Sequence, residues 1–186
     1  AVLFLNKHSL RLIIIKQEDQ MKATHPQDEI VSRSLVFRKK CYLAAGWFNP
    51  AQAAELDGLE AILDERADWI DLASPRRIFV CPPNASKEVQ DATYHGNLKH
   101  IREADFLVVN TRDKDLGTIF EVGYAAAHDK PIVYFCAGLP EGAKFNLMLA
   151  RSGIKVCTSF EQLRDYLDRC REAGDLLHEP YTDAIE

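Results

Sequence analysis

The chain has 186 residues, of which 47% are apolar and 27% charged, and its formal net charge is -5. This composition suits one folded α/β domain with an appendage, and the acidic balance without a Lys/Arg patch argues against a nucleic-acid polymer as a partner. No apolar run approaches the ~20 residues that span a bilayer, so no membrane association is expected.

The two ends of the chain are expected to lie outside the main domain, as an N-terminal extension and linker (1–40) and a C-terminal tail without strong periodicity (176–186). Within the extension, "RLIIIK" is β-branched and could add a strand or contact another subunit. The early charges and the lack of a small-residue cleavage site do not fit a signal peptide. Whether the residues before Met21 belong to the natural chain is left open.

The predicted domain covers 41–175 and begins with a strand, "CYLAA", at 41–45. A helical pattern follows at 50–67. Asn49 can cap this helix, and Pro50 fits its first position.

Strand and helix patterns continue to alternate along the middle of the chain. "RIFVC" predicts a second strand at 77–81, and a helix weakened by Gly96 is expected at 85–104. "FLVVN" predicts the third strand at 106–110, and a short helix follows at 117–128.

The last part of the domain predicts a fourth strand at 131–136, a helical turn at 146–153 and a fifth strand at 154–157. The final helix is the clearest of all, because Ser159 and Gln162 form a capping box ahead of an apolar stripe.

Five cysteines occur without a C-x-x-C pair, mostly in apolar runs, at positions 41, 81, 136, 157 and 170. They are expected to be buried reduced thiols, which makes the cytoplasm the default location. There is no zinc or calcium ligand spacing, no P-loop and no G-x-G-x-x-G, so neither a metal nor a dinucleotide cofactor is expected.

Five short apolar strands that alternate with helices predict an α/β fold with a parallel sheet covered on both faces. The simplest assembly is a flavodoxin-like, doubly wound five-stranded parallel sheet with strand order 2-1-3-4-5. Ligands of such sheets bind beyond the carboxyl ends of the strands where the winding reverses, here between the first and third strands. This rule selects two loops, "AAGWFNP" (44–50) and "TRDKDLGT" (111–118).

Glu121 follows the second loop, near the N-terminus of a helix with apolar neighbours. The helix dipole favours a negative charge there, so Glu121 could stay ionised in an enclosed site, as a carboxylate nucleophile must. Asp115 on the loop can accept hydrogen bonds from a ligand hydroxyl, and Gly117 lets the backbone come close. The alternative is a helix with surface acids near its positive end.

Tyr42 lies on the first strand, beside the third, and its hydroxyl could donate to Glu121 and fix the rotamer of that carboxylate. The alternative is a core tyrosine whose hydroxyl lies at the rim. Gly46, Trp47 and Phe48 follow at the crevice, where stacking of a planar base on the rings would be worth ~1–3 kcal/mol. Alternatively, these residues form a hydrophobic lid over the sheet edge.

Asn146 starts the helical turn, and its amide could bind a sugar hydroxyl or simply cap the turn. Met148 follows it, and a methionine at such a position is more typical of a core than of a ligand contact.

These segments are similar to those of a known family. "YLAAGWF" (42–48), "ATYHGNLKHI" (92–101), "DLGTIFEVGYA" (115–125) and "FNLMLARSG" (145–153) resemble, in order, the nucleoside 2-deoxyribosyltransferases. The likeness covers about residues 41–153, and the D-x-G-T-x-x-E-x-G-Y-A segment is fairly specific.

The resemblance implies roles for individual residues. Glu121 matches the nucleophile that attacks C1′ of the deoxyribose, and Tyr42 the tyrosine that orients it. Asp115 matches the acid that holds the sugar hydroxyls. Asn146 matches the asparagine that reaches the 5′-hydroxyl, in the family often from a neighbouring subunit. The implied partners are deoxynucleosides, free nucleobases and further copies of the chain, because the family forms dimers and often hexamers.

Asn97 departs from the family pattern, since the best-known members have an Asp that contacts the base there. An amide can hydrogen-bond a base edge but cannot serve as a general acid at neutral pH, so the preferred base and the proton donor stay open. A smaller departure is Ala44 followed by Ala45, where Gly-Ala is usual.

The implied reaction is transfer of 2-deoxyribose between nucleobases by a retaining double displacement through a covalent glycosyl-Glu121 intermediate. Two alternatives stay open. One is an N-glycoside hydrolase acting on deoxynucleosides or their 5′-monophosphates, although "GWFNP" replaces the small polar loop that a phosphate pocket needs. The other is a non-catalytic nucleotide-binding module, which Asn97 keeps open.

Overall fold

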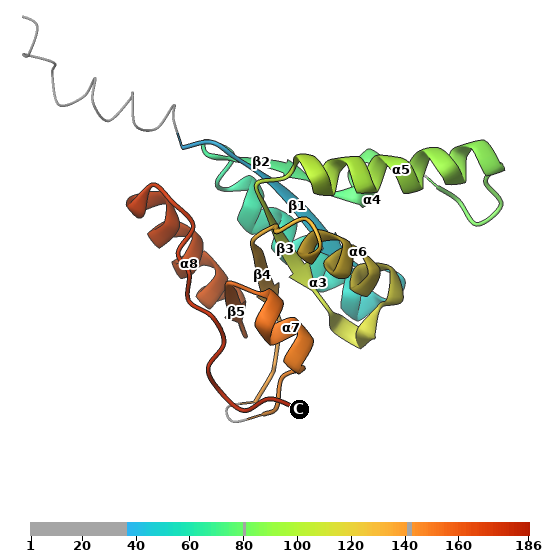
Figure 1. Ribbon diagram of the computed structural model, residues 1–186. Coiled ribbons are helices and arrows are strands. Elements are labelled where there is room, and N and C mark those ends of the chain that lie inside the picture. The colour runs from blue at the N-terminus through green and yellow to red at the C-terminus, as the bar shows by residue number, and fades with distance from the viewer. Residues whose placement is uncertain (1–36, 80, 141–142) are drawn as a thin grey trace, which may run out of the picture. The chain divides into compact units, whose positions relative to one another are not determined.

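The computed structural model describes residues 37–186 except 80, 141 and 142. Its centre is a five-stranded sheet in the order β2-β1-β3-β4-β5 (Figure 1), and every neighbouring pair is parallel. The strands are β1 (Lys39–Ala45), β2 (Ile70–Ala73), β3 (Phe106–Asn110), β4 (Ile132–Phe135) and β5 (Lys155–Cys157). The predicted flavodoxin-like α/β fold and its strand order are therefore confirmed.

Helices cover both faces of the sheet, as expected. They are α3 (Pro50–Asp64), α4 (Pro75–Ile78), α5 (Lys87–Glu103), α6 (Leu116–Ala126), α7 (Leu147–Ser152) and α8 (Phe160–Ala173), with a 3-10 turn, η1 (Arg112–Lys114), before α6. Because side chains alternate along a strand, Leu43 and Val108 point into the core formed with α3 and α8. Tyr42 and Leu107 point into the other core, formed with α5 and α6.

The second strand is the main error of the sequence prediction, because it does not lie at 77–81. The observed β2 is an edge strand with an exposed Asp71, so it lacks the long apolar run that marks the buried strands. The first two residues of the segment predicted as a strand are the end of α4, a short helix whose Arg76 bonds Glu60 of α3. This contact joins residues that are far apart in sequence, so a local pattern does not reveal it.

Local helix signals account for two further details. The cap of α8 is confirmed, since Ser159 Oγ accepts from the Gln162 amide, but the Gln162 side chain accepts from the Thr158 amide rather than from the capping residue itself. Gly96 does not break α5, and a Cβ there would lie 2.4 Å from Cζ of Phe79. A larger residue at position 96 would therefore require the Phe79 ring to move.

The cysteines are all free thiols, and three of them, Cys41, Cys157 and Cys170, are buried. Cys81 is exposed, because the segment that carries it does not enter the sheet, so its predicted burial is wrong. The extension with its possible extra strand lies outside the described residues, and the domain boundaries stay a prediction. Within the described part of the chain, no helix has the length and apolar character needed to cross a membrane.

The sheet order places the two loops selected from the sequence side by side. Ala45 at the end of β1 is the register partner of Asn110 at the end of β3, so the chain leaves both strands at the same edge. The first loop leads into α3 and the second, through η1, into α6. This is the crevice where the winding of the sheet reverses.

Candidate active site

Glu121 and Tyr42 form the centre of the site. The Tyr42 hydroxyl donates a 2.6 Å hydrogen bond to Oε1 of Glu121, as the sequence predicts. Tyr42 is fully buried on β1, while Glu121 is half-buried on α6. Because the tyrosine side chain belongs to the packed core, it fixes the carboxylate against a rigid strand.

Burial raises the pKa of Glu121 to about 7, although the hydrogen bond from Tyr42 works in the opposite direction and the charge of Asp115 adds to the rise. With a pKa of about 7, Glu121 is partly ionised near neutral pH. Glu121 lies in the second turn of α6, beyond the free N–H groups of the first turn. Burial and the neighbouring carboxylate also raise the pKa of Tyr42, so its phenol remains a hydrogen-bond donor.

Asp115 caps α6 with one of its two carboxylate oxygens. Its Oδ2 accepts from both the amide and the hydroxyl of Thr118, each at 2.8 Å. Its Oδ1 has no hydrogen-bond partner among the described residues, so it can accept from a ligand. Gly117 is exposed in the first turn and would place a Cβ 3.4 Å from the Asp115 carboxylate.

The first loop presents two aromatic rings to solvent. Trp47 and Phe48 stack with ring centroids 5.4 Å apart, and Phe48 is 73% exposed, so it does not form a closed lid over the sheet edge. Gly46 is buried before them, and a Cβ there would lie 3.1 Å from Oε1 of Gln52. The rings are thus available as a stacking surface beside a closely packed backbone.

Asn97 on α5 is partly buried, and its Oδ1 is inaccessible and has no hydrogen-bond partner. Nearby on the same helix, Tyr94 lies against Phe120 of α6, with ring centroids 6.2 Å apart. The amide group therefore lies on a helix that packs against α6.

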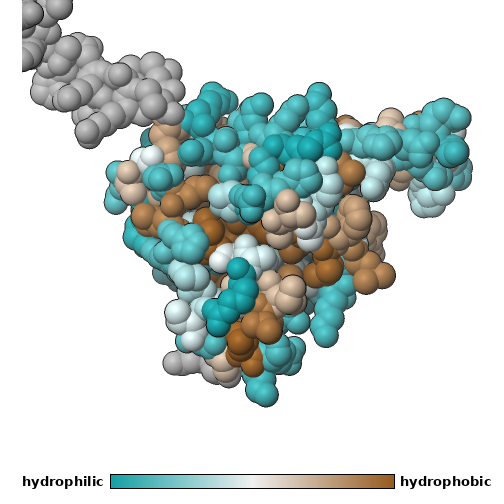
Figure 2. Space-filling model, viewed as in Figure 1, coloured by the Kyte–Doolittle hydropathy of each residue, from teal (hydrophilic) through white to brown (hydrophobic). Residues whose placement is uncertain are grey.

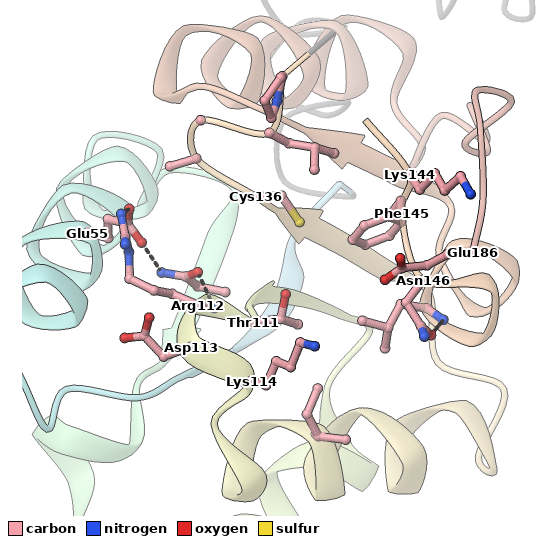
Figure 3. A pocket seen from close by; sticks show the side chains of 17 residues that line it. Glu55, Thr111, Arg112, Asp113, Lys114, Cys136, Lys144, Phe145, Asn146 and Glu186 are labelled. Atoms are coloured by element: carbon pink, nitrogen blue, oxygen red, sulfur yellow. Dashed lines mark hydrogen bonds and ion pairs between the residues drawn. The ribbon is translucent and has the colours of Figure 1, made fainter. Parts of the chain in front are cut away.

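Asn146 caps α7, because its Oδ1 accepts from the amides of Met148 and Leu149. Met148 is 75% exposed, so it does not belong to the core. Asn146 lines a cavity of about 440 Å³ (Figure 3), whose lining includes neither Glu121 nor Tyr42. One chain thus brings together Tyr42, Glu121 and Asp115, while Asn146 lines this cavity, which also contacts Asp113 of the second loop and Ile119 of α6.

Hydrophobic side chains gather over α6 and α7 on the face seen in Figure 2. The exposed apolar residues of these two helices are Leu116, Phe120, Leu147 and Met148. Leu116 and Phe120 precede Glu121 on α6, so this surface adjoins the site.

Several buried polar residues near Glu121 and the two loops are not predicted from the sequence. Gln52, Glu55, Asn110 and Thr118 are all buried and hydrogen-bonded around the two loops. A signal for two of them exists in the sequence, since polar residues recur every third position from Asn49 onward, where an amphipathic helix facing a core would be apolar.

The fold is that of an α/β protein of the flavodoxin-like class, and Glu121 and Tyr42 lie near the switch point of its sheet. The chain belongs to the nucleoside 2-deoxyribosyltransferase family, whose model matches residues 41–150. Membership of this family supports an enzyme.

Several solved structures are similar to this chain, including the following two. A 2-deoxyribosyltransferase from Bacillus psychrosaccharolyticus has 25% sequence identity and a TM-score of 0.64, with 77% of this chain and 99% of that chain covered. A conserved protein from Enterococcus faecalis V583 has 19% identity and a TM-score of 0.58, with 71% and 98% covered, and shows the fold alone. A comparison with curated proteins found no match.

Proposed function

We propose that this protein transfers 2-deoxyribose from a deoxynucleoside to a free nucleobase. The observation that carries the proposal is the hydrogen bond from Tyr42 to Glu121, which holds a carboxylate at the switch point of the sheet. Family membership and the similarity to a 2-deoxyribosyltransferase at 25% identity support it.

The proposed reaction is a double displacement at C1′ of the sugar. An ionised oxygen of Glu121 attacks C1′ while the C1′–N bond breaks, and the electron pair of that bond leaves with the base. A second base then attacks C1′ from the side that the first base left. The bond between C1′ and the Glu121 oxygen breaks, and configuration is retained. Tyr42 stabilises the carboxylate as the free nucleophile and as the leaving group of the second step.

The surrounding residues have proposed binding roles. The free Oδ1 of Asp115 accepts from a sugar hydroxyl, and Gly46 and Gly117 let the backbone approach the substrate. Trp47 and Phe48 stack on the base.

Two further elements of the proposal concern the base and the 5′ end of the sugar. Asn97 contacts the base edge, while Asn146 and Met148 approach the substrate of a second copy of the chain. The exposed apolar residues on α6 and α7 are the proposed contact surface for that copy, in a dimer or hexamer. The proposed setting is nucleotide salvage in the cytoplasm, without a metal or other cofactor.

Incubation with deoxyinosine, with and without adenine, tests the proposal by chromatography of the products. We expect deoxyadenosine to form only when adenine is present. The Glu121→Ala variant should lose this exchange while remaining folded, whereas Glu172→Ala, a change at an exposed position of α8, should not. Release of hypoxanthine at the same rate with and without adenine would instead indicate a hydrolase. Binding without turnover would indicate a non-catalytic module.

A further inference from the structure

Three polar side chains at the start of α3 connect the two loops of the site. Asn49, Gln52 and Glu55 recur at every third position, so they lie close to one another along the helix surface. All three bond to the segment between β3 and α6, and none of them has a role in the proposed chemistry.

Gln52 bonds to both loops at once. Its Oε1 accepts from the amide of Phe48 at 2.9 Å, and its Nε2 lies 3.5 Å from the carbonyl oxygen of Arg112. Asn49 adds a second contact, since its Nδ2 donates to Asp113 at 2.9 Å while its Oδ1 caps α3. The start of α3 is therefore tied to the loop that leads to α6.

Glu55 makes the most buried of these contacts. It is 9% exposed, and its Oε2 accepts from Nδ2 of Asn110 at 2.8 Å. Its Oε1 pairs with the guanidinium of Arg112 at 2.6 Å, and Oδ1 of Asn110 accepts from the Arg112 amide at 3.0 Å. Figure 3 shows Glu55 and Arg112 of this set at one side of the cavity.

The loop held in this way has an unfavourable backbone. Asp113 and Lys114 follow one another with φ of 60° and 53°, in the left-handed region that residues other than glycine rarely adopt. Such a conformation persists only where surrounding contacts enforce it. The next residue is Asp115, which caps α6 and so sets where the helix carrying Glu121 begins.

We propose that Glu55 is a positioning residue that, through Asn110 and Arg112, places Asp115 for its contact with the sugar. This inference rests on the proposed function. Without the carboxylate, the guanidinium of Arg112 loses its partner, and the strained loop relaxes away from the end of β3.

The test is Glu55→Gln, with Glu60→Gln as the matched control. Glu60 lies on the same helix, is 3% exposed and also bonds an arginine, Arg76, but its partners belong to α4 and the end of β2. We expect Glu55→Gln to lower kcat of deoxyribosyl transfer by at least about tenfold with little change in KM, because small misplacements of a reacting group are costly. We expect Glu60→Gln to retain kcat within about twofold, even if both variants lower Tm equally.

A double-mutant cycle identifies the residue through which Glu55 acts. In the background of Asp115→Ala, Glu55→Gln should cost less than about twofold in kcat, because the group that it places is gone. A full, additive loss, or a Glu55→Gln enzyme as active as Glu60→Gln, would overturn the inference.

Hydrogen exchange separates this inference from the proposed function. Amides of residues 110–118 should exchange at least about tenfold faster in Glu55→Gln than in Glu60→Gln. Unchanged exchange overturns the inference whatever the activity, whereas a wild-type protein inactive on every deoxynucleoside overturns the proposed function.

Discussion

Glu121 on α6 and Tyr42 on β1 are 79 positions apart in the chain and are joined by a hydrogen bond of 2.6 Å. Two opposing effects act on the ionisation of the Glu121 carboxylate. Burial favours the protonated form of Glu121. The phenol of Tyr42 donates a hydrogen bond to the carboxylate and so partly restores the ionised form. Because only the ionised form can attack C1′, the tyrosine is expected to set the pH range of the reaction.

The first prediction is that Tyr42→Phe moves the acid limb of the pH profile of kcat/KM upward. Loss of the donor removes the interaction that lowers the pKa of Glu121, so this pKa rises above about 7. A hydrogen bond to a charged group is worth about 1.5–3 kcal/mol, which corresponds to a loss of roughly tenfold or more in rate at neutral pH. The loss should shrink at alkaline pH. An acid limb that stays in place, measured by initial rates across the pH range, would contradict this role.

The second prediction concerns stability. The pKa of Glu121 is raised from 4.5 to about 7 on folding, so the folded protein holds this proton more tightly than the unfolded chain. The ionisation therefore reduces the stability of the fold as pH rises from about 4.5 to about 7, and the deficit remains at higher pH. Glu121→Gln, which cannot ionise but can still accept from Tyr42, should gain about 1–3 kcal/mol relative to wild type at about pH 8.

Scanning calorimetry at about pH 4 and about pH 8 measures this difference in Tm. The two proteins should melt at similar temperatures in acid and several degrees apart in base. Glu172→Gln, at an exposed position of α8, is the control and should track wild type at both pH values. An equal offset at both pH values would mean that burial does not raise this pKa.

The third prediction is that Asn97→Asp raises the rate on substrates whose base must be protonated to leave. The side-chain oxygen of Asn97 is buried without a partner, so a carboxyl group there would be kept protonated by desolvation and could act as an acid. General acid catalysis is typically worth about 10²–10⁴-fold. The comparison uses deoxyadenosine and 7-methyl-2′-deoxyguanosine, whose base already carries a positive charge.

We expect the gain on deoxyadenosine alone. Equal gains on both substrates would show that the substitution acts by something other than proton donation, such as base stacking.

The fold was largely readable from the sequence because its signals are local. Four of the five strands are short apolar runs, and Asn49 and Ser159 cap their helices where expected. The strand that the sequence misplaces, β2, is short and lies at the sheet edge, and the charged Asp71 interrupts its apolar pattern. The short helix α4 overlaps the start of the strand predicted at 77–81, and it depends on Arg76, whose partners lie on another helix.

Only part of the site could be predicted from the sequence. The topology rule and the resemblance to the family together led to Tyr42 and Glu121, and the hydrogen bond between them is confirmed. The protonation of Glu121 was not readable, because it depends on how much of the side chain the fold covers. The bond from Asn110 to Glu55 was missed because it spans 55 positions and leaves no local pattern.

The last prediction concerns Gly58, in the middle of α3, where helix propensity and side-chain packing predict opposite effects of alanine on stability. Alanine is favoured over glycine within a helix by about 0.8–1 kcal/mol, so local reasoning predicts that Gly58→Ala stabilises the protein. In the structure a Cβ at this position would lie 2.5 Å from Cζ of Phe160, and that ring stacks on Phe135 with centroids 4.7 Å apart. The ring has a core neighbour behind it, so we expect a net destabilisation of about 1–3 kcal/mol.

Gly123→Ala in α6 is the control, since a Cβ there meets nothing within 4 Å and the substitution should stabilise the helix. Urea denaturation of the two variants decides the matter, and a stabilised Gly58→Ala protein would show that Phe160 can move aside without loss.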